Sequence, residues 1–119
     1  MAITTNDRGY KFDFDTVNEH FDELAAVEIG RYTVSRESMD KIEKILDLEN
    51  QDEEHLRAIR NAVVSVFHDK EMKEANLTED GEEIPGKKVN YDKMMFWSNK
   101  ISGITAVIDN VLWTKGYGV

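Results

Sequence analysis

Apolar residues recur at helical spacing in four stretches of the chain, and these stretches predict its secondary structure. In the first stretch, Val17, Phe21 and Leu24 are separated by steps of four and three residues, as on one face of a helix. Thr16 and Glu19 have the spacing of a capping box. A first helix is therefore expected to begin at Thr16 and to stop near Gly30.

The next two stretches predict a helical hairpin. Ser35 is placed to cap a helix, and Asn50 and Glu53 form a second capping-box spacing that opens a longer helix ending near Ala75. The short join between the two helices favours antiparallel neighbours. The inward stripes are Met39, Ile42, Ile45 and Leu46 on the first helix and Leu56, Ile59, Val63, Val66 and Phe67 on the second.

A fourth stretch, residues 91–114, predicts a helix capped by Asn90 and ended at Gly116. At 100° per residue its apolar side chains fill a broad arc, and Met95 and Trp113 fall on the opposite side. A helix that is apolar nearly all round is buried on nearly all sides, so we expect it to be the central helix. The arc consists of Met94, Trp97, Ile101, Ile104, Ile108, Val111 and Leu112.

A strip of small residues lies on this helix between its apolar arc and the side that carries Met95 and Trp113. Another helix could approach the backbone closely along this strip. The occupant is either a helix of the same chain, a partner protein or a second copy. Trp113 lies off the main stripe, and tryptophan is enriched at contact hot spots, so we expect it to be an exposed anchor. The strip consists of Asn99, Ser102, Gly103, Ala106 and Asn110.

The remaining segments lack a helical period. Residues 1–15 alternate apolar and polar side chains around Tyr10, Phe12 and Phe14, which predicts a short extended N-terminal arm. Residues 76–89 are expected to form a polar loop, which can contain a small β-hairpin around Asp80 and Gly81. The predicted fold class is mainly α: one domain over residues 1–119, a bundle of about four helices. Its core is expected to contain Phe21, Leu24, Ile42, Leu46, Leu56, Ile59, Val63, Phe67, Ile101, Ile104 and Ile108.

Composition supports one folded domain and excludes several classes of protein. Of the 119 residues, 40% are hydrophobic and 33% charged, too apolar a mixture for a disordered acidic tail. The absence of cysteine excludes a disulfide scaffold, a thiol nucleophile and zinc–cysteine or iron–sulfur sites. No segment resembles a signal peptide or a membrane span, so the expected location is the cytoplasm, or the host cytoplasm if the protein is phage-encoded.

Charge is divided unevenly along the chain. Residues 1–86 hold 22 acidic and 10 basic residues, and residues 87–119 hold two acidic and five basic ones. The lysines of the second part are interleaved with aromatic residues, as in some single-strand binders. However, an acidic body repels phosphates, so direct nucleic-acid binding is not expected.

Metal and catalytic motifs are not met, and no catalytic residue, cofactor or metal ligand is predicted. The residues three before His20, His55 and His68 are not glutamates, as a di-iron bundle requires. The segment from Asn76 resembles a calcium loop until its twelfth position, where Lys87 replaces the bidentate glutamate. Phosphate-binding glycine loops and nucleophile elbows are absent from the sequence. We therefore expect a non-enzyme, and a small enzyme with a site assembled from distant residues stays open as a third hypothesis.

These features favour a small acidic protein-binding protein. An acidic face would engage a protein with a basic surface, such as a nucleic-acid-handling protein, and block it. The compositional profile is common among phage and mobile-element accessory proteins. The alternatives are that the acidic residues only keep the domain soluble, or that the chain is a structural subunit, for example a virion component, that self-associates through its last helix and N-terminal arm. The acidic face comprises Asp13, Asp15, Glu19, Asp22, Glu23, Asp47, Glu49, Asp52, Glu53 and Glu54.

Overall fold

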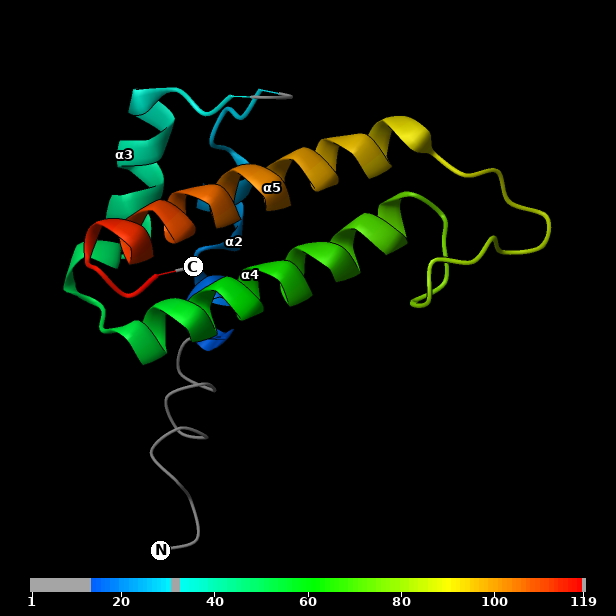
Figure 1. Ribbon diagram of the computed structural model, residues 1–119. Coiled ribbons are helices and arrows are strands. Elements are labelled where there is room, and N and C mark those ends of the chain that lie inside the picture. Colours follow the sequence, from blue (N-terminus) through cyan, green and yellow to red (C-terminus); the bar gives the residue numbers. More distant parts are fainter. Residues whose placement is uncertain (1–13, 31–32, 119) are drawn as a thin grey trace, which may run out of the picture.

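A long antiparallel helical hairpin forms the frame of the molecule (Figure 1). The computed structural model describes residues 14–30 and 33–118. In chain order, these contain a helical segment at 14–19, α2 (Phe21–Ala25), α3 (Arg36–Ile45), the 3₁₀ turn η1 (Leu48–Asn50), α4 (Glu53–Glu74) and α5 (Tyr91–Thr114). The predicted mainly α-helical bundle is confirmed.

Helices α4 and α5 lie side by side along most of their lengths and are joined by the loop at 75–90. Two polar contacts fix their register. The indole Nε1 of Trp97 donates to Glu74 Oε1 at 2.9 Å near the loop, and Arg60 Nε donates to Asp109 Oδ1 at 2.7 Å further along. Helix α3 packs against α5 near the end remote from the loop.

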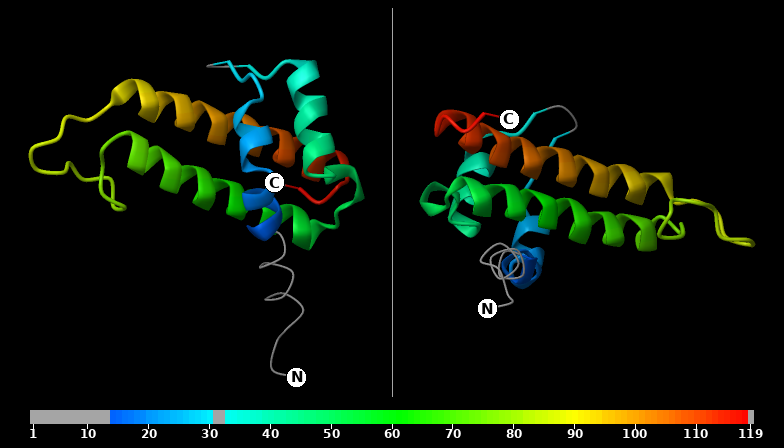
Figure 2. Two further views of the ribbon diagram at one scale, coloured as in Figure 1. Left: turned by 180° about the vertical axis from the view of Figure 1, so that it is seen from behind. Right: turned by 60° about the horizontal axis from the view of Figure 1, so that its bottom comes forward.

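The short α2 lies across one broad side of the α4–α5 hairpin (Figure 2, left). Phe21 reaches into the hairpin, and its ring centroid lies 4.8 Å from that of Phe67 and 5.6 Å from that of Trp97. The opposite broad side of the hairpin carries no helix of the described chain (Figure 1). The hairpin is therefore covered by the first helices on one side only.

One hydrophobic core joins these elements. Every predicted core residue belongs to it; Phe21 and Ile101 are partly buried and the other nine are buried. Leu48 from η1 and Val17 from the segment 14–19 complete it and are fully buried.

Several helix ends form as their residue types predict. The side chain of Ser35 accepts from Ser38 N at the start of α3, and that of Asn90 accepts from Lys93 N at the start of α5. After α5, Gly116 takes a left-handed φ of 81°, and the Tyr117 amide donates to the Leu112 carbonyl. This is the Schellman ending that glycine favours.

The start of the chain differs from its prediction. Phe14 and Asp15 are helical, so the expected extended arm does not reach residue 15, and the rest of that arm lies outside the described residues. Thr16 is inside a helix and does not begin one. The expected helix up to Gly30 is interrupted at His20 and ends at Ala25. The apolar period holds across the interruption, because Val17 and Leu24 are both buried.

The cap of α4 is Asp52 and not Asn50. Asp52 Oδ1 accepts from His55 N at 2.9 Å, whereas Asn50 belongs to η1 and donates to Asp47 Oδ1 at 2.7 Å. Asp47 has a left-handed φ of 51°, which ends α3 and turns the chain toward α4. Two acceptable capping residues stand two positions apart, and the geometry of this turn selects the second.

The loop between α4 and α5 contains a minimal form of the predicted hairpin. Leu77 and Glu83 form an isolated antiparallel bridge, and Gly81 takes a φ of 82° in the turn between them. Asn76 ends α4 in the left-handed region, and its Nδ2 donates to the Lys88 carbonyl at 3.0 Å. Asn76 therefore ties the two ends of the loop together.

Helix α5 is less enclosed than its composition predicts. Its Trp97, Ile104 and Ile108 are buried against the rest of the bundle, but Met95 is 44% and Trp113 69% exposed. The expectation of a helix buried on nearly all sides is wrong for this face, because α4, α3 and the residues Ile29 and Val34 pack on other sides of α5.

Candidate protein-interaction surfaces

The predicted acidic residues form two groups on the surface. All of those described are exposed, and Asp13 lies outside the described residues. Asp15 and Glu19 lie on the segment 14–19, followed by Asp22 and Glu23 on α2. The second group is at the join between α3 and α4, and comprises Asp47, Glu49, Asp52, Glu53 and Glu54.

The two groups are separated along α4. Phe14 and Asn18 of the segment 14–19 line a hollow with Val66 and Lys70 from the second half of α4, whereas the second group surrounds the first turn of that helix. Thirteen residues of helix, from Glu53 to Val66, span about 20 Å. The structure therefore does not bring the predicted acidic face together as one continuous patch.

Several acidic side chains have structural partners. The Nδ1 atom of His20 lies 3.0 Å from Glu23 Oε1, and the Nε atom of Arg57 lies 3.0 Å from Glu53 Oε2. Asp52 is occupied as the cap of α4, and Asp47 accepts from Asn50. Such surface contacts contribute little to stability, but they fix the side chains in place and reduce the free negative charge.

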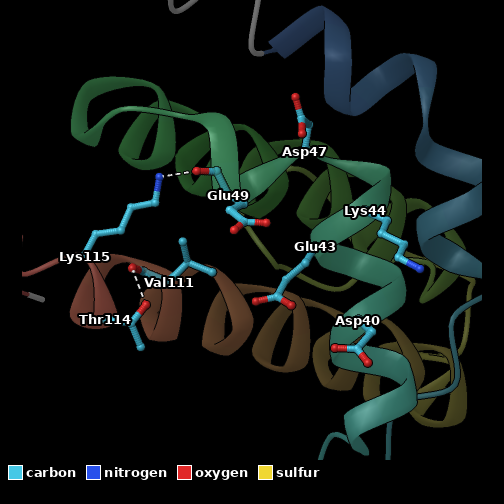
Figure 3. Close-up of a pocket in the computed structure, with 8 residues that line it drawn as sticks. All are labelled: Asp40, Glu43, Lys44, Asp47, Glu49, Val111, Thr114 and Lys115. Atoms are coloured by element: carbon cyan, nitrogen blue, oxygen red, sulfur yellow. Dashed lines mark hydrogen bonds between the residues drawn. The ribbon is translucent and has the colours of Figure 1, made fainter.

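A cleft lies beside the second group, between α3, η1 and the end of α5 (Figure 3). It has a volume of about 510 Å³. Glu43 and Glu49 lie on the side of α3 and η1 that faces α5, whereas Lys44 extends outward. We call this site the acidic cleft; it is lined by Asp40, Glu43, Lys44, Asp47, Glu49, Val111, Thr114 and Lys115.

Lys115 lines the acidic cleft and adds a positive charge to it. Its ammonium group donates to the backbone carbonyl of Glu49 and, at 2.9 Å, to that of Gln51. Lys115 therefore ties the end of α5 to the turn before α4. The cleft thus combines four carboxylates and two lysines with the apolar side chain of Val111.

Asp40 and Glu43 were absent from the predicted acidic face. Together with Asp47 they follow the steps of three and four residues that mark one side of a helix. That spacing is a signal in the sequence, but only the fold shows that this side of α3 meets the end of α5.

The small strip of α5 is divided between two environments. Gly103 is buried beneath Ile29 and Val34, so residues of the same chain cover that part of the strip. Asn99 is partly buried. Ser102, Ala106, Asn110 and Trp113 are exposed. Only this second part is available to another molecule.

The lysines of the last part of the chain do not form one basic strip. Lys93 lies 3.5 Å from Glu74, and Lys115 is bonded to carbonyls as described above. Lys100 is buried, donates to the Val27 carbonyl and lies 5.1 Å from the centroid of the Phe96 ring. Burial lowers the pKa of Lys100, and the nearby Glu28 carboxylate opposes this effect. These three lysines serve contacts within the protein.

Within residues 14–30 and 33–118, no group of three or more histidine, aspartate or glutamate side chains has a geometry suited to a metal ion. In the segment that resembles a calcium loop, Asn76 bonds to Lys88 and the Thr78 hydroxyl accepts from Glu82 N at 3.0 Å. These side chains shape the loop itself.

None of the helices in the described part of the chain has the length and apolar character needed to cross a membrane. Comparison of the chain with protein-family models, with curated proteins and with solved structures finds no match.

Proposed function

We propose that this protein is a non-enzymatic binding protein that engages a basic surface of a partner protein through the acidic cleft. The observation that carries this proposal is the excess of carboxylates over ammonium groups in the cleft lining. Four carboxylates, those of Asp40, Glu43, Asp47 and Glu49, line it against two lysines, of which Lys44 extends outward and Lys115 is held by backbone carbonyls. A carboxylate-lined site in a protein of net charge −9 attracts basic partners and speeds their association.

The chemistry of the cleft fits an arginine or lysine side chain. Such side chains combine an apolar stem with a charged head. Val111 offers the stem an apolar contact, and the carboxylates of Glu43 and Glu49 can accept hydrogen bonds from the head. A nucleic-acid-handling protein, whose basic nucleic-acid-binding surface would supply such side chains and be blocked by their capture, is the kind of partner that this chemistry suits. A phage or mobile-element accessory role agrees with such a function.

A binding assay with matched charge changes tests this proposal. The probe is a fluorescently labelled arginine-rich peptide, and its binding is followed by anisotropy at low and high salt. The cleft variant combines Asp40→Asn, Glu43→Gln and Glu49→Gln. The control combines Asp15→Asn, Glu19→Gln and Asp22→Asn, which removes the same number of charges from the first group.

We expect the cleft variant to weaken binding at least tenfold and the control to weaken it only slightly. Binding should also weaken as salt rises, because the Debye length falls to about 8 Å at physiological ionic strength. Equal losses in the two variants would show that binding follows net charge alone. The acidic residues would then serve solubility, and the proposal would fail.

A further inference from the structure

The exposed side of α5 carries two large apolar residues with small residues between them. Met95 is 44% exposed and Trp113 69% exposed. Ser102 and Ala106 lie between them and are also exposed. These four residues, separated by steps of seven, four and seven, lie on one side of the helix, and we call them the α5 face. Trp113 exposes a large aromatic side chain of the kind that is enriched at contact hot spots, so this face can serve as a contact with another molecule.

We infer that two copies of this chain pair through the α5 face, with the two α5 helices antiparallel and a two-fold axis that crosses the interface at the level of Ile104 along the helix. Met95 and Trp113 each stand nine residues from Ile104, and Ser102 and Ala106 each stand two residues from it. A two-fold interface requires that if residue i contacts residue j, then j also contacts i. The spacing of the α5 face satisfies this condition.

In this arrangement the Met95 side chain of one copy lies against the partner's Trp113, and the same contact is repeated at the other end. Thioether–aromatic contacts of this kind are favourable. Ser102 and Ala106 meet at the centre, where their small side chains let the helices approach closely. A second copy therefore offers each large residue a complementary neighbour.

Helix α4 widens the surface. Val64, which is 37% exposed, follows Arg60 by one helical turn, and Arg60 bonds to Asp109 across the hairpin. Val64 is therefore level with the middle of α5. Two helices about 35 Å long with axes 8–10 Å apart offer roughly 650 Å² per copy, near the lower end of a standard interface of about 800 Å² per partner. A weak, concentration-dependent dimer is expected.

Charge on this surface favours a second copy over a basic partner. Arg60 is paired with Asp109, and Arg57 with Glu53 near the start of α4, so these charges cancel locally. Two molecules that each carry a net charge of −9 repel one another and can associate only through such a surface. A two-fold pair also closes on itself, so this contact by itself produces a dimer and not an open assembly.

Sedimentation velocity from about 10 μM to 1 mM tests the inference on the complete chain. We expect wild type to shift toward a dimer as its concentration rises. Ala106→Glu places two like charges beside the two-fold axis, and Trp113→Ala removes both large contacts, so each should raise the dimer dissociation constant at least tenfold. Ala26→Glu is the matched control, because Ala26 is an exposed alanine directly after α2, and α2 lies across the other broad side of the hairpin (Figure 2, left).

Orientation can be tested by disulfide formation, because the chain contains no cysteine. A mixture of Met95→Cys and Trp113→Cys should form an intermolecular disulfide, while the second Met95–Trp113 contact of that pair is kept. Neither variant should cross-link with itself, because two copies of the same position would be about 27 Å apart along an antiparallel pair, well beyond disulfide reach.

Three results would overturn the inference: wild type that stays monomeric at 1 mM, Ala106→Glu that dimerises as wild type does, or Met95→Cys that cross-links with itself alone. Each is independent of the acidic cleft, so the peptide-binding assay and the dimer assay can fail separately.

Discussion

Ile29 lies directly over Gly103, so that a Cβ atom at Gly103 would overlap the Ile29 Cγ2 and lie 3.0 Å from its Cδ1. Val34 Cγ2 would be 3.2 Å away. Since Gly103 is in the middle of α5 and has no left-handed φ, space and not backbone conformation requires glycine here. Ile29 and Val34 therefore pack onto α5 at a point where any side chain would separate them from the helix.

Gly103→Ala should for this reason destabilise the protein. Overpacking costs about 1–3 kcal/mol, which is more than the roughly 1 kcal/mol that alanine gains over glycine in a helix. Urea denaturation would measure the change. The loss of stability caused by Gly103→Ala should be smaller in a protein that also carries Ile29→Ala, because the second change opens the same space. A rise in stability for Gly103→Ala alone would contradict the close contact.

Ile104→Ala should lower the free energy of unfolding by about 2–5 kcal/mol, because it leaves a cavity at a fully buried position. Ile104→Asp should prevent folding, since the carboxylate would be buried without a partner. Circular dichroism melts measure both effects. Ser102→Asp, two residues earlier on the exposed side, is the control and should retain the fold.

The two candidate caps of α4 should differ in their effect on stability. Asp52→Ala removes the acceptor for His55 N and should cost about 1 kcal/mol, within the usual range for a lost cap. Asn50→Ala removes only an exposed contact to Asp47 and should cost less than half as much. Chemical denaturation of the two variants compares them directly. The opposite ranking would restore Asn50 as the cap.

Two glutamates on the last turns of α4 should give opposite pH dependence. The hydrogen bond from the Trp97 indole, followed by that from Lys70, lowers the pKa of Glu74 below its ordinary value of 4.5. Glu74 therefore contributes stability above pH 4.5, and this contribution is lost as the pH falls through its folded pKa. The stability difference between wild type and Glu74→Gln should be full near pH 7 and shrink below pH 4.5.

Glu71 is the matched control for this measurement. Burial raises the pKa of Glu71 above 4.5, and His68 partly opposes the rise. Its ionised form is therefore disfavoured in the folded state, and stability decreases as the pH rises from 4.5 through the raised pKa. Glu71→Gln should be more stable than wild type at pH 7. Thermal melts across pH 3–8 that show the same trend for both variants would contradict this assignment.

Helical elements that depend on local chemistry can be predicted from the order of residues alone. The apolar periods of α3, α4 and α5 are long, and caps such as Ser35 and Asn90 act within one turn of their own helix, so neighbouring residues are enough to predict them. The core followed for the same reason: a residue on the apolar side of a helix, such as Leu46 or Phe67, is buried whichever neighbour covers it.

Which helix surfaces are covered by other segments depends on how the helices pack together. Gly103 and Ser102 are adjacent small residues, and the sequence does not distinguish them; Ile29 covers one and leaves the other exposed. Likewise, Asp40 and Glu43 became part of a cleft only because the end of α5 lies against α3. Helical periodicity reports the direction of a side chain relative to its own helix axis, whereas burial and the formation of a cleft depend on segments far away in the chain, whose positions only the packed structure supplies.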